Sequence, residues 1–340
     1  MPGDRNELGD RNEITPLRTF TMKTIRDLRS SLLRLQKRLF LAAPMLLFLL
    51  ATQAITVAQS VSGNFSAVSG DLNANDRVLL RAKKVYVTAF QDDIVQVFSL
   101  RGSDLGVFAN VPGPTGLVFD GVGNLFVAGG RRPNYAIQKY LPDGTGSTFA
   151  DSSSGLDGPH GLVFDEAGNL YVANLTGNTI EKFTPDGTGT IFAGAADGLD
   201  SPVDLAFDTA GNLYVSNFDG GPTHTGSVLK FTPDGVGSVF ADSGLDKAFG
   251  IAFDRAGNLY VANFDGDTVE EFSPTGEDLG VFASTGLAGP LGMMFDRDGN
   301  LYVANRDTNT IEKFSPTGED LGVFANTAGG PHFLTMFRPR

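Results

Sequence analysis

The sequence predicts an all-β protein built from six repeated four-stranded units that close into a ring. The first observation is a segment, Gly-Asn-Leu-(Phe/Tyr)-Val, that occurs five times, each time shortly after a Phe-Asp pair. The aspartates of these pairs are separated by 45, 43, 46 and 42 residues and are Asp120, Asp165, Asp208, Asp254 and Asp296. A unit this short cannot bury its own apolar face, so it must pack against its neighbours.

The second observation is the plan of one repeat, residues 159–199. Residues 160–164, 170–174 and 179–183 alternate as strands, and a Pro-Asp-Gly turn at 185–187 leads into a fourth strand. No segment of the repeat has a helical period. Four short strands per unit are typical of one blade of a β-propeller. Asp165 and Asn169 are interpreted as turn formers, because Asp accepts hydrogen bonds from nearby backbone and Asn tolerates positive φ.

The third observation is the strand count, which predicts how the ring closes. In each unit the first strand precedes the Phe-Asp turn and the second strand follows it. The sequence has six segments of the second-strand type, including residues 85–88, but only five of the first-strand type before the C-terminal segment. Residues 330–337 repeat the Gly-Pro-His pattern of residues 158–164. We therefore expect the C-terminal segment to supply the innermost strand of the blade formed by residues 85–109, which leaves the ring without an open edge.

The first 82 residues are predicted to lie outside the ring. Residues 1–58 are interpreted as a signal peptide, because basic side chains precede an apolar run at 39–51 and small residues follow at Thr56 and Ala58. Met22 is an alternative start, and residues 59–82 are interpreted as a flexible linker before a single propeller domain at 83–340. The expected location is secreted or periplasmic. An uncleaved anchor is the alternative, although the run is shorter than the roughly 20 residues that span a bilayer.

The charge balance argues against two classes of partner. The net charge is −13, and removal of residues 1–58, which hold nine basic and five acidic side chains, would make it −17. Such a surface repels nucleic acid and anionic membranes, so neither is expected to bind the mature chain. The absence of cysteine excludes disulfides and thiol chemistry. The mature protein is expected to be a monomer.

The repeated cadence Pro-x-Gly, Phe-Asp-x-x-Gly-Asn-Leu-Tyr-Val-Ala-Asn, Ile-x-Lys-Phe-Thr-Pro-Asp-Gly resembles NHL-repeat propellers across residues 83–340. The wider group includes the senescence marker protein/gluconolactonase family and the virginiamycin B lyase family. The first resemblance implies a divalent cation, usually calcium, held at the channel by Glu, Asn and Asp. The second implies a magnesium site with a Glu and a histidine base. This chain departs from both, because the positions that begin its innermost strands are Thr115, His160, Val203, Phe249, Leu291 and His332.

Candidate site residues gather on one face of the predicted ring. Loops that enter the innermost strands and loops that join second to third strands emerge there, around the axial channel. His160 and His332 begin innermost strands, and His224 lies in an insertion at 219–226. Asp204 takes a position that is usually Gly. Imidazole and carboxylate could bind a cation or move a proton. The candidate ligand or metal site is therefore His160, Asp204, His224 and His332.

Secondary candidates on the same face are Thr115, Asn174, Asn217, Asn263 and Asn305. The asparagines repeat at equivalent positions, which favours a structural role in capping the adjoining loops. No cofactor is assigned, and a divalent cation is left open.

The function predicted from the sequence is a binding module for a small ligand, a glycan or a protein on the channel face. A metal-dependent hydrolase of the gluconolactonase type is the first alternative, and a lyase is the second. A binding module predicts an aromatic or polar rim. An enzyme predicts a deep channel with a cation and at least two carboxylates within reach.

Overall fold

The structure, a computed structural model, describes residues 84–221 and 225–337. Within these residues 24 strands form six antiparallel four-stranded sheets, the blades of a β-propeller. Blade 1 contains β24 (Pro331–Met336), β1 (Lys84–Ala89), β2 (Ile94–Ser99) and β3 (Asp104–Asn110). Blade 2 contains β4 (Leu117–Phe119), β5 (Leu125–Arg131), β6 (Asn134–Tyr140) and β7 (Gly146–Asp151). Blade 3 contains β8 (Pro159–Phe164), β9 (Leu170–Asn174), β10 (Thr179–Phe183) and β11 (Gly189–Ala193).

The other three blades repeat this order from the inside outward. Blade 4 contains β12 (Pro202–Phe207), β13 (Leu213–Asn217), β14 (Ser227–Phe231) and β15 (Gly237–Ala241). Blade 5 contains β16 (Ala248–Phe253), β17 (Leu259–Asn263), β18 (Thr268–Phe272) and β19 (Asp278–Ala283). Blade 6 contains β20 (Pro290–Phe295), β21 (Leu301–Asn305), β22 (Thr310–Phe314) and β23 (Asp320–Asn326). Two single 3₁₀ turns, η1 (Ser152–Ser154) and η2 (Ala195–Asp197), precede the innermost strands of blades 3 and 4.

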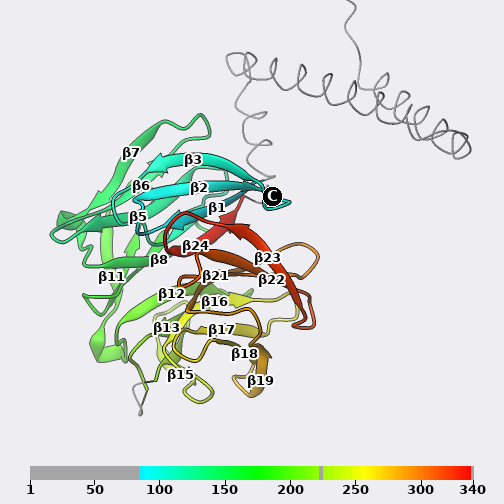
Figure 1. The fold of residues 1–340 in the computed structure, drawn as a ribbon. Helices are drawn as coiled ribbons and strands as arrows, with labels where there is room; N and C mark the ends of the chain where they lie inside the picture. Colours follow the sequence, from blue (N-terminus) through cyan, green and yellow to red (C-terminus); the bar gives the residue numbers. More distant parts are fainter. Residues whose placement is uncertain (1–83, 222–224, 338–340) are drawn as a thin grey trace, which may run out of the picture. The chain divides into compact units, whose positions relative to one another are not determined.

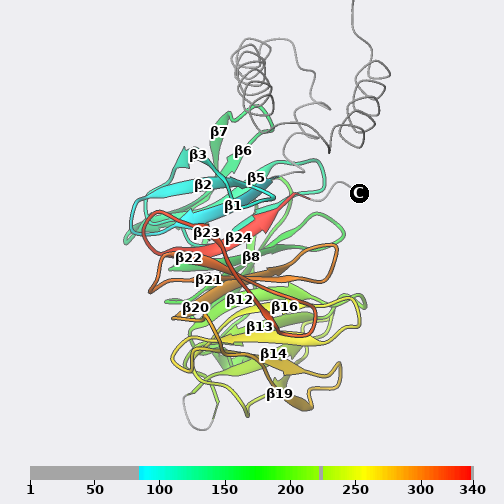
Figure 2. The ribbon, with the colours of Figure 1, turned by 45° about the vertical axis from the view of Figure 1, so that its right-hand side comes forward.

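The predicted closure is confirmed. Strand β24 pairs with β1 in antiparallel register, and Figures 1 and 2 both show red β24 beside cyan β1. The backbone N–H of Phe333 donates to Thr88 Oγ1 at 3.0 Å, and Thr88 Oγ1 donates to the carbonyl of Thr115 in blade 2 at 2.7 Å. Because β24 also contacts β20 of blade 6 and β4 of blade 2, it completes the ring at the axis.

Aromatic side chains hold neighbouring blades together. Tyr171 of blade 3 contacts Phe192 of its own outer strand and Phe207 of blade 4, each at a centroid distance of 5.2 Å and nearly perpendicular. Edge-to-face pairs of this kind are each worth about 0.5–1.5 kcal/mol beyond their buried area. The arrangement recurs around the ring, so the apolar faces of the blades pack against their neighbours as predicted.

The turns between first and second strands have the predicted role. Asp165 Oδ1 accepts from the backbone N–H of Asn169 at 2.8 Å, and its Oδ2 accepts from Asn169 Nδ2 at 2.7 Å. Asp208 with Asn212 and Asp296 with Asn300 form the same pair of bonds. None of the helices in the described part of the chain has the length and apolar character to cross a bilayer. The apolar run at 39–51 lies outside that part.

Candidate functional site

Three rings meet where the innermost strands of alternate blades begin. His332 on β24, His160 on β8 and Phe249 on β16 come from blades 1, 3 and 5. Ring centroids are 5.5 Å apart for the two histidines, 6.0 Å for His160 and Phe249, and 5.7 Å for Phe249 and His332. These are contact distances for rings, so the three side chains touch one another near the axis at this end of the propeller. We call His160, Phe249 and His332 the ring cluster.

Smaller side chains alternate with the ring cluster around the axis. Val203 and Leu291 lie at the start of the innermost strands of blades 4 and 6, Thr115 lies two residues before β4 of blade 2, and all three are buried. Val203 and Leu291 share an apolar cluster with Phe249 and Phe333. Thr115 Oγ1 donates to the carbonyl of Pro159 at 2.8 Å, so its hydroxyl links blade 2 to blade 3. The ring cluster is therefore flanked by buried, mostly apolar side chains.

A second set of side chains surrounds the ring cluster and was not predicted. These side chains follow the second strands of five blades, and we call them the rim: Phe90, Leu175, Phe218, Phe264 and Arg306. Phe90 stacks on His332 with centroids 5.1 Å apart and planes 21° apart. Phe218 and Phe264 contact Phe249 at 6.2 and 6.3 Å. The repeat itself could have indicated the rim, because each rim residue stands immediately after one of the repeated second strands.

Both histidines of the ring cluster are electrically neutral at physiological pH. Burial lowers the pKa of His160 to about 4 and that of His332 to about 3, with nearby His160 and Arg306 contributing to the second value. The Nδ1 atom of each imidazole is buried and has no hydrogen-bond partner among the described residues. A buried polar atom without a partner is uncommon in folded proteins. The ring cluster thus holds two uncharged imidazoles with unused hydrogen-bonding capacity.

Asp204 has a different environment from the one the sequence suggested. Its Oδ1 accepts from the N–H of Leu205 at 2.8 Å, and its Oδ2 accepts from the N–H of Ile251 in blade 5 at 2.9 Å. Burial raises the pKa of this carboxyl to about 7, and the two N–H groups oppose that rise. At the equivalent Gly250, an added Cβ would lie 2.2 Å from the Leu291 carbonyl oxygen, so glycine allows adjacent inner strands to approach closely. Asp204 instead bridges β12 to β16, and among the described residues it makes no hydrogen bond or ion pair to His160 or His332.

The four strand-end asparagines brace the loops that lead into the inner strands. Asn174 Nδ2 donates to the Gly155 carbonyl at 2.9 Å, and its Oδ1 accepts from the Asp157 N–H at 3.1 Å. Asn217, Asn263 and Asn305 make the same two bonds to equivalent residues. Their amides therefore already have loop backbone partners. His224, the remaining predicted site residue, lies outside the described residues, so its convergence with His160 and Asp204 stays a prediction.

The side chains at the described channel face do not fit the calcium site that the gluconolactonase resemblance implies. Calcium takes six to eight oxygen ligands, mostly carboxylate and carbonyl. The start positions of the innermost strands carry two imidazoles and no carboxylate. Across residues 84–221 and 225–337 there is no group of three or more His, Cys, Asp or Glu side chains that could hold a metal ion.

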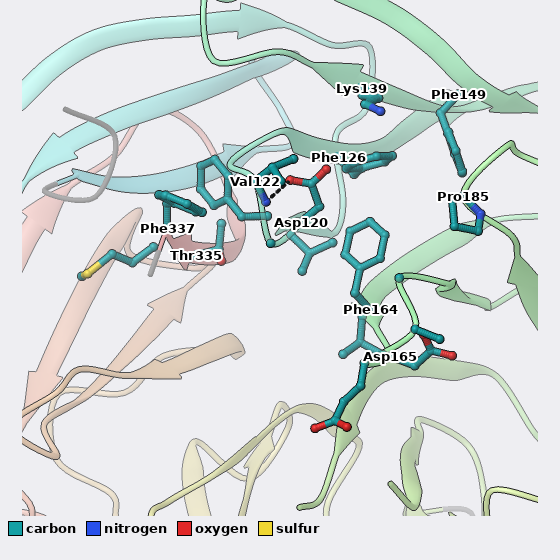
Figure 3. Close-up of a pocket in the computed structure, with 18 residues that line it drawn as sticks. Asp120, Val122, Phe126, Lys139, Phe149, Phe164, Asp165, Pro185, Thr335 and Phe337 are labelled. Carbon is teal, nitrogen blue, oxygen red and sulfur yellow. Dashed lines mark hydrogen bonds between the residues drawn. The ribbon is translucent and has the colours of Figure 1, made fainter. Parts of the chain in front are cut away.

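A pocket of about 570 Å³ lies on the opposite face, between blades 2 and 3 and the end of β24. Figure 3 shows Phe126, Phe164 and Phe337 around it, with the carboxylates of Asp120 and Asp165. Asp165 is one of the turn formers described above, and Asp120 has the same role in its own turn, where it accepts from Asn124 Nδ2 at 2.6 Å. The volume lies in the range of small-molecule pockets. It is an alternative to the channel face as a binding site.

The propeller resembles solved structures in fold. A chain in the crystal structure of a nidogen/laminin complex matches with a TM-score of 0.64 and 19% identity, over 74% of this chain and 97% of that one. The structure of a putative gluconolactonase matches with a TM-score of 0.54 and 20% identity, over 62% of this chain and 77% of that one. No protein-family model matches the sequence, and no curated protein matches it either. At such low identity these similarities show a shared β-propeller fold.

Proposed function

We propose that this protein is a binding module whose ligand site is the ring cluster together with the rim. The observation that carries the proposal is the pair of buried Nδ1 atoms of His160 and His332, which lie among aromatic rings and have no hydrogen-bond partner among the described residues. The fold does not need imidazole there, since Val203 and Leu291 fill equivalent positions with apolar side chains. Leaving a buried polar atom without a partner costs about 1–3 kcal/mol, so a ligand that supplies the partner would recover that energy.

The arrangement favours binding over the two enzymatic alternatives. A hydrolase of the gluconolactonase type or a lyase of the second family would need a cation and carboxylates at the channel. The positions that begin the innermost strands carry no carboxylate, and the oxygens of Asp204, the nearest predicted carboxylate, already accept from backbone N–H groups. An aromatic rim is instead suited to stacking on a flat or ring-shaped ligand.

A small molecule is the proposed ligand class, with a glycan or a protein as the alternatives. A propeller of this fold occurs in a nidogen/laminin complex, which makes protein recognition the second possibility to test. We also propose that the protein acts outside the cytoplasm, because its leader has the basic and apolar segments of a signal peptide.

The histidines provide the test, because the chain contains only three. NMR of histidine-labelled protein should resolve three imidazole signals, and His160→Gln and His332→Gln assign the two at the ring cluster. D-glucose, N-acetylglucosamine, benzamide and benzoate are then added singly. The proposal expects at least one probe to shift both assigned signals, and Phe249→Leu to weaken that probe's binding.

Two outcomes would overturn it. In one, no probe shifts the ring-cluster signals. In the other, every probe that binds is weakened by a substitution in the opposite pocket, such as Phe164→Leu, and not by Phe249→Leu. Calcium and zinc chloride are tested alone, and a shift of both assigned signals by either metal would favour the metal-dependent alternative.

A further inference from the structure

Arg306 is the one charged residue in the rim. Equivalent positions in blades 1, 3, 4 and 5 carry Phe or Leu, whereas blade 6 carries arginine. Its guanidinium carbon lies 4.2 Å from the ring centroid of Phe264, which in turn contacts Phe249 of the ring cluster. The positive charge is close enough to His332 to contribute to its lowered pKa. Arg306 is therefore linked to the ring cluster both by contact and by charge.

The guanidinium of Arg306 is only partly used within the described structure. Its Nε donates to Asp307 Oδ1 at 2.7 Å, and no partner of its two Nη groups is present among the described residues. Arg131, on the same face in blade 2, provides a contrast. Both of its Nη groups donate to the carboxylate of Asp93, at 3.1 and 2.7 Å. Both Nη groups of Arg131 are thus already engaged by a carboxylate, whereas the two-nitrogen edge of Arg306 has no partner among the described residues.

The position over the Phe264 ring and the Nε bond to Asp307 together restrict the orientation of that edge. A planar guanidinium edge matches a carboxylate with two parallel hydrogen bonds, and prior orientation of the arginine reduces the entropy lost when they form. The neutral imidazoles of His160 and His332 add hydrogen-bonding capacity without a competing charge. Phe90, Phe249 and Phe264 supply apolar surface.

We propose that the channel face binds a small organic acid with a flat apolar ring. Its carboxylate pairs with the Nη edge of Arg306, and its ring packs against the phenylalanines of the rim and ring cluster. The inference rests on the proposed function and adds the ligand's charge and shape. A cationic ligand is disfavoured, because Arg306 would repel it.

The experiment compares benzoate with benzamide, which has the same ring and nearly the same shape but no charge. Dissociation constants are measured from the assigned imidazole signals in wild type, Arg306→Gln, Arg306→Lys and Arg131→Gln. Wild type should bind benzoate about 10-fold or more tightly than benzamide, as expected for a charge-assisted bidentate pair. Arg306→Gln should abolish this preference and Arg306→Lys should retain part of it. Arg131→Gln, which removes an arginine already paired with Asp93 on the same face, should leave it unchanged.

The outcomes separate this inference from the proposed function. Equal binding of benzoate and benzamide at the ring cluster, or an unchanged preference in Arg306→Gln, would overturn the organic-acid inference while leaving a channel-face site intact. Tighter binding of glucuronate than of benzoate would overturn the apolar ring and favour a sugar acid. If none of these probes shifts the ring-cluster signals, both proposals fail. Thermal unfolding of each variant confirms that a loss of binding is not a loss of fold.

Discussion

Replacing Glu270 and Glu312 by glutamine should stabilise the protein at pH 8 and have much less effect at pH 5. Each glutamate is at least 95% buried on a third strand, beside the aspartate that begins the neighbouring outer strand: Asp278 for Glu270 and Asp320 for Glu312. Burial and the adjacent aspartate raise the pKa of each glutamate from 4.5 to about 7. A carboxyl with a higher pKa in the folded chain stabilises fully below pH 4.5 and loses that contribution as the pH rises through 7.

The size of the effect follows from the two pKa values. A rise from 4.5 to about 7 corresponds to about 3 kcal/mol of unfolding free energy per carboxyl. Because Asp278 is exposed and solvent screens its charge, we expect a gain of about 1–3 kcal/mol per substitution at pH 8. Blade 1 already contains the proposed arrangement, since Gln96 Nε2 donates to Asp104 Oδ2 at 3.0 Å.

The assay is urea unfolding followed by circular dichroism at pH 5 and pH 8. Glu277→Gln, which removes an exposed carboxylate from the same blade, controls for the general relief of net negative charge. The reasoning is refuted if Glu270→Gln and Glu312→Gln show the same pH dependence as wild type. It is also refuted if Glu277→Gln stabilises the protein at pH 8 by as much as they do.

Three further predictions concern closure, the buried aspartate and export. Deleting residues 331–340 removes β24 and leaves β1 unpaired, so the sharp thermal transition should be lost; an unchanged melting temperature would contradict this. Asp204→Gly should cost about 1–3 kcal/mol at pH 5, because the Ile251 N–H loses its acceptor. The cost should be smaller at pH 8, because a carboxyl whose pKa is raised to about 7 loses its stabilising contribution as the pH rises through 7. If urea unfolding gives the same free-energy difference between wild type and Asp204→Gly at pH 5 and pH 8, the raised pKa of Asp204 is wrong. The mature chain should begin near Gln59, which N-terminal sequencing of extracellular or periplasmic protein tests, and recovery of an intact 39–51 segment in membranes would favour an anchor.

The architecture could be predicted because its information is local and repeated. Alternation within residues 160–164 and the turn residues Asp165 and Asn169 recur with a nearly constant period, and each copy supports the interpretation of the others. Even the long-range pairing of β24 with β1 followed from a count of strands, since residues 330–337 match the first-strand pattern and no other blade lacked one.

The candidate site could be predicted only in part, because its chemistry depends on partners that carry no sequence signal. Position in the repeat put His160 and His332 on one face, but their 5.5 Å separation and contact with Phe249 depend on the width of the closed ring. The acceptor role of Asp204 toward the Ile251 N–H could not be anticipated, since nearly every residue has such a donor. Arg306 could not be recognised from its position alone, because its link to the ring cluster depends on contacts with Phe264 and His332.

Ring closure by the last strand also sets an order of events in biosynthesis. Thr88 and Phe333, which hydrogen-bond across the closing pair, are 245 residues apart, so β1 emerges long before its partner exists. During that interval its edge is a template for pairing with other chains. Joining ends so distant in sequence is entropically slow and comes late in folding. A ribosome that stalls before codon 331 would therefore release a chain in which the edge of β1 is unpaired and can associate with other chains. We expect chaperones or proteases to be needed for the removal of such fragments.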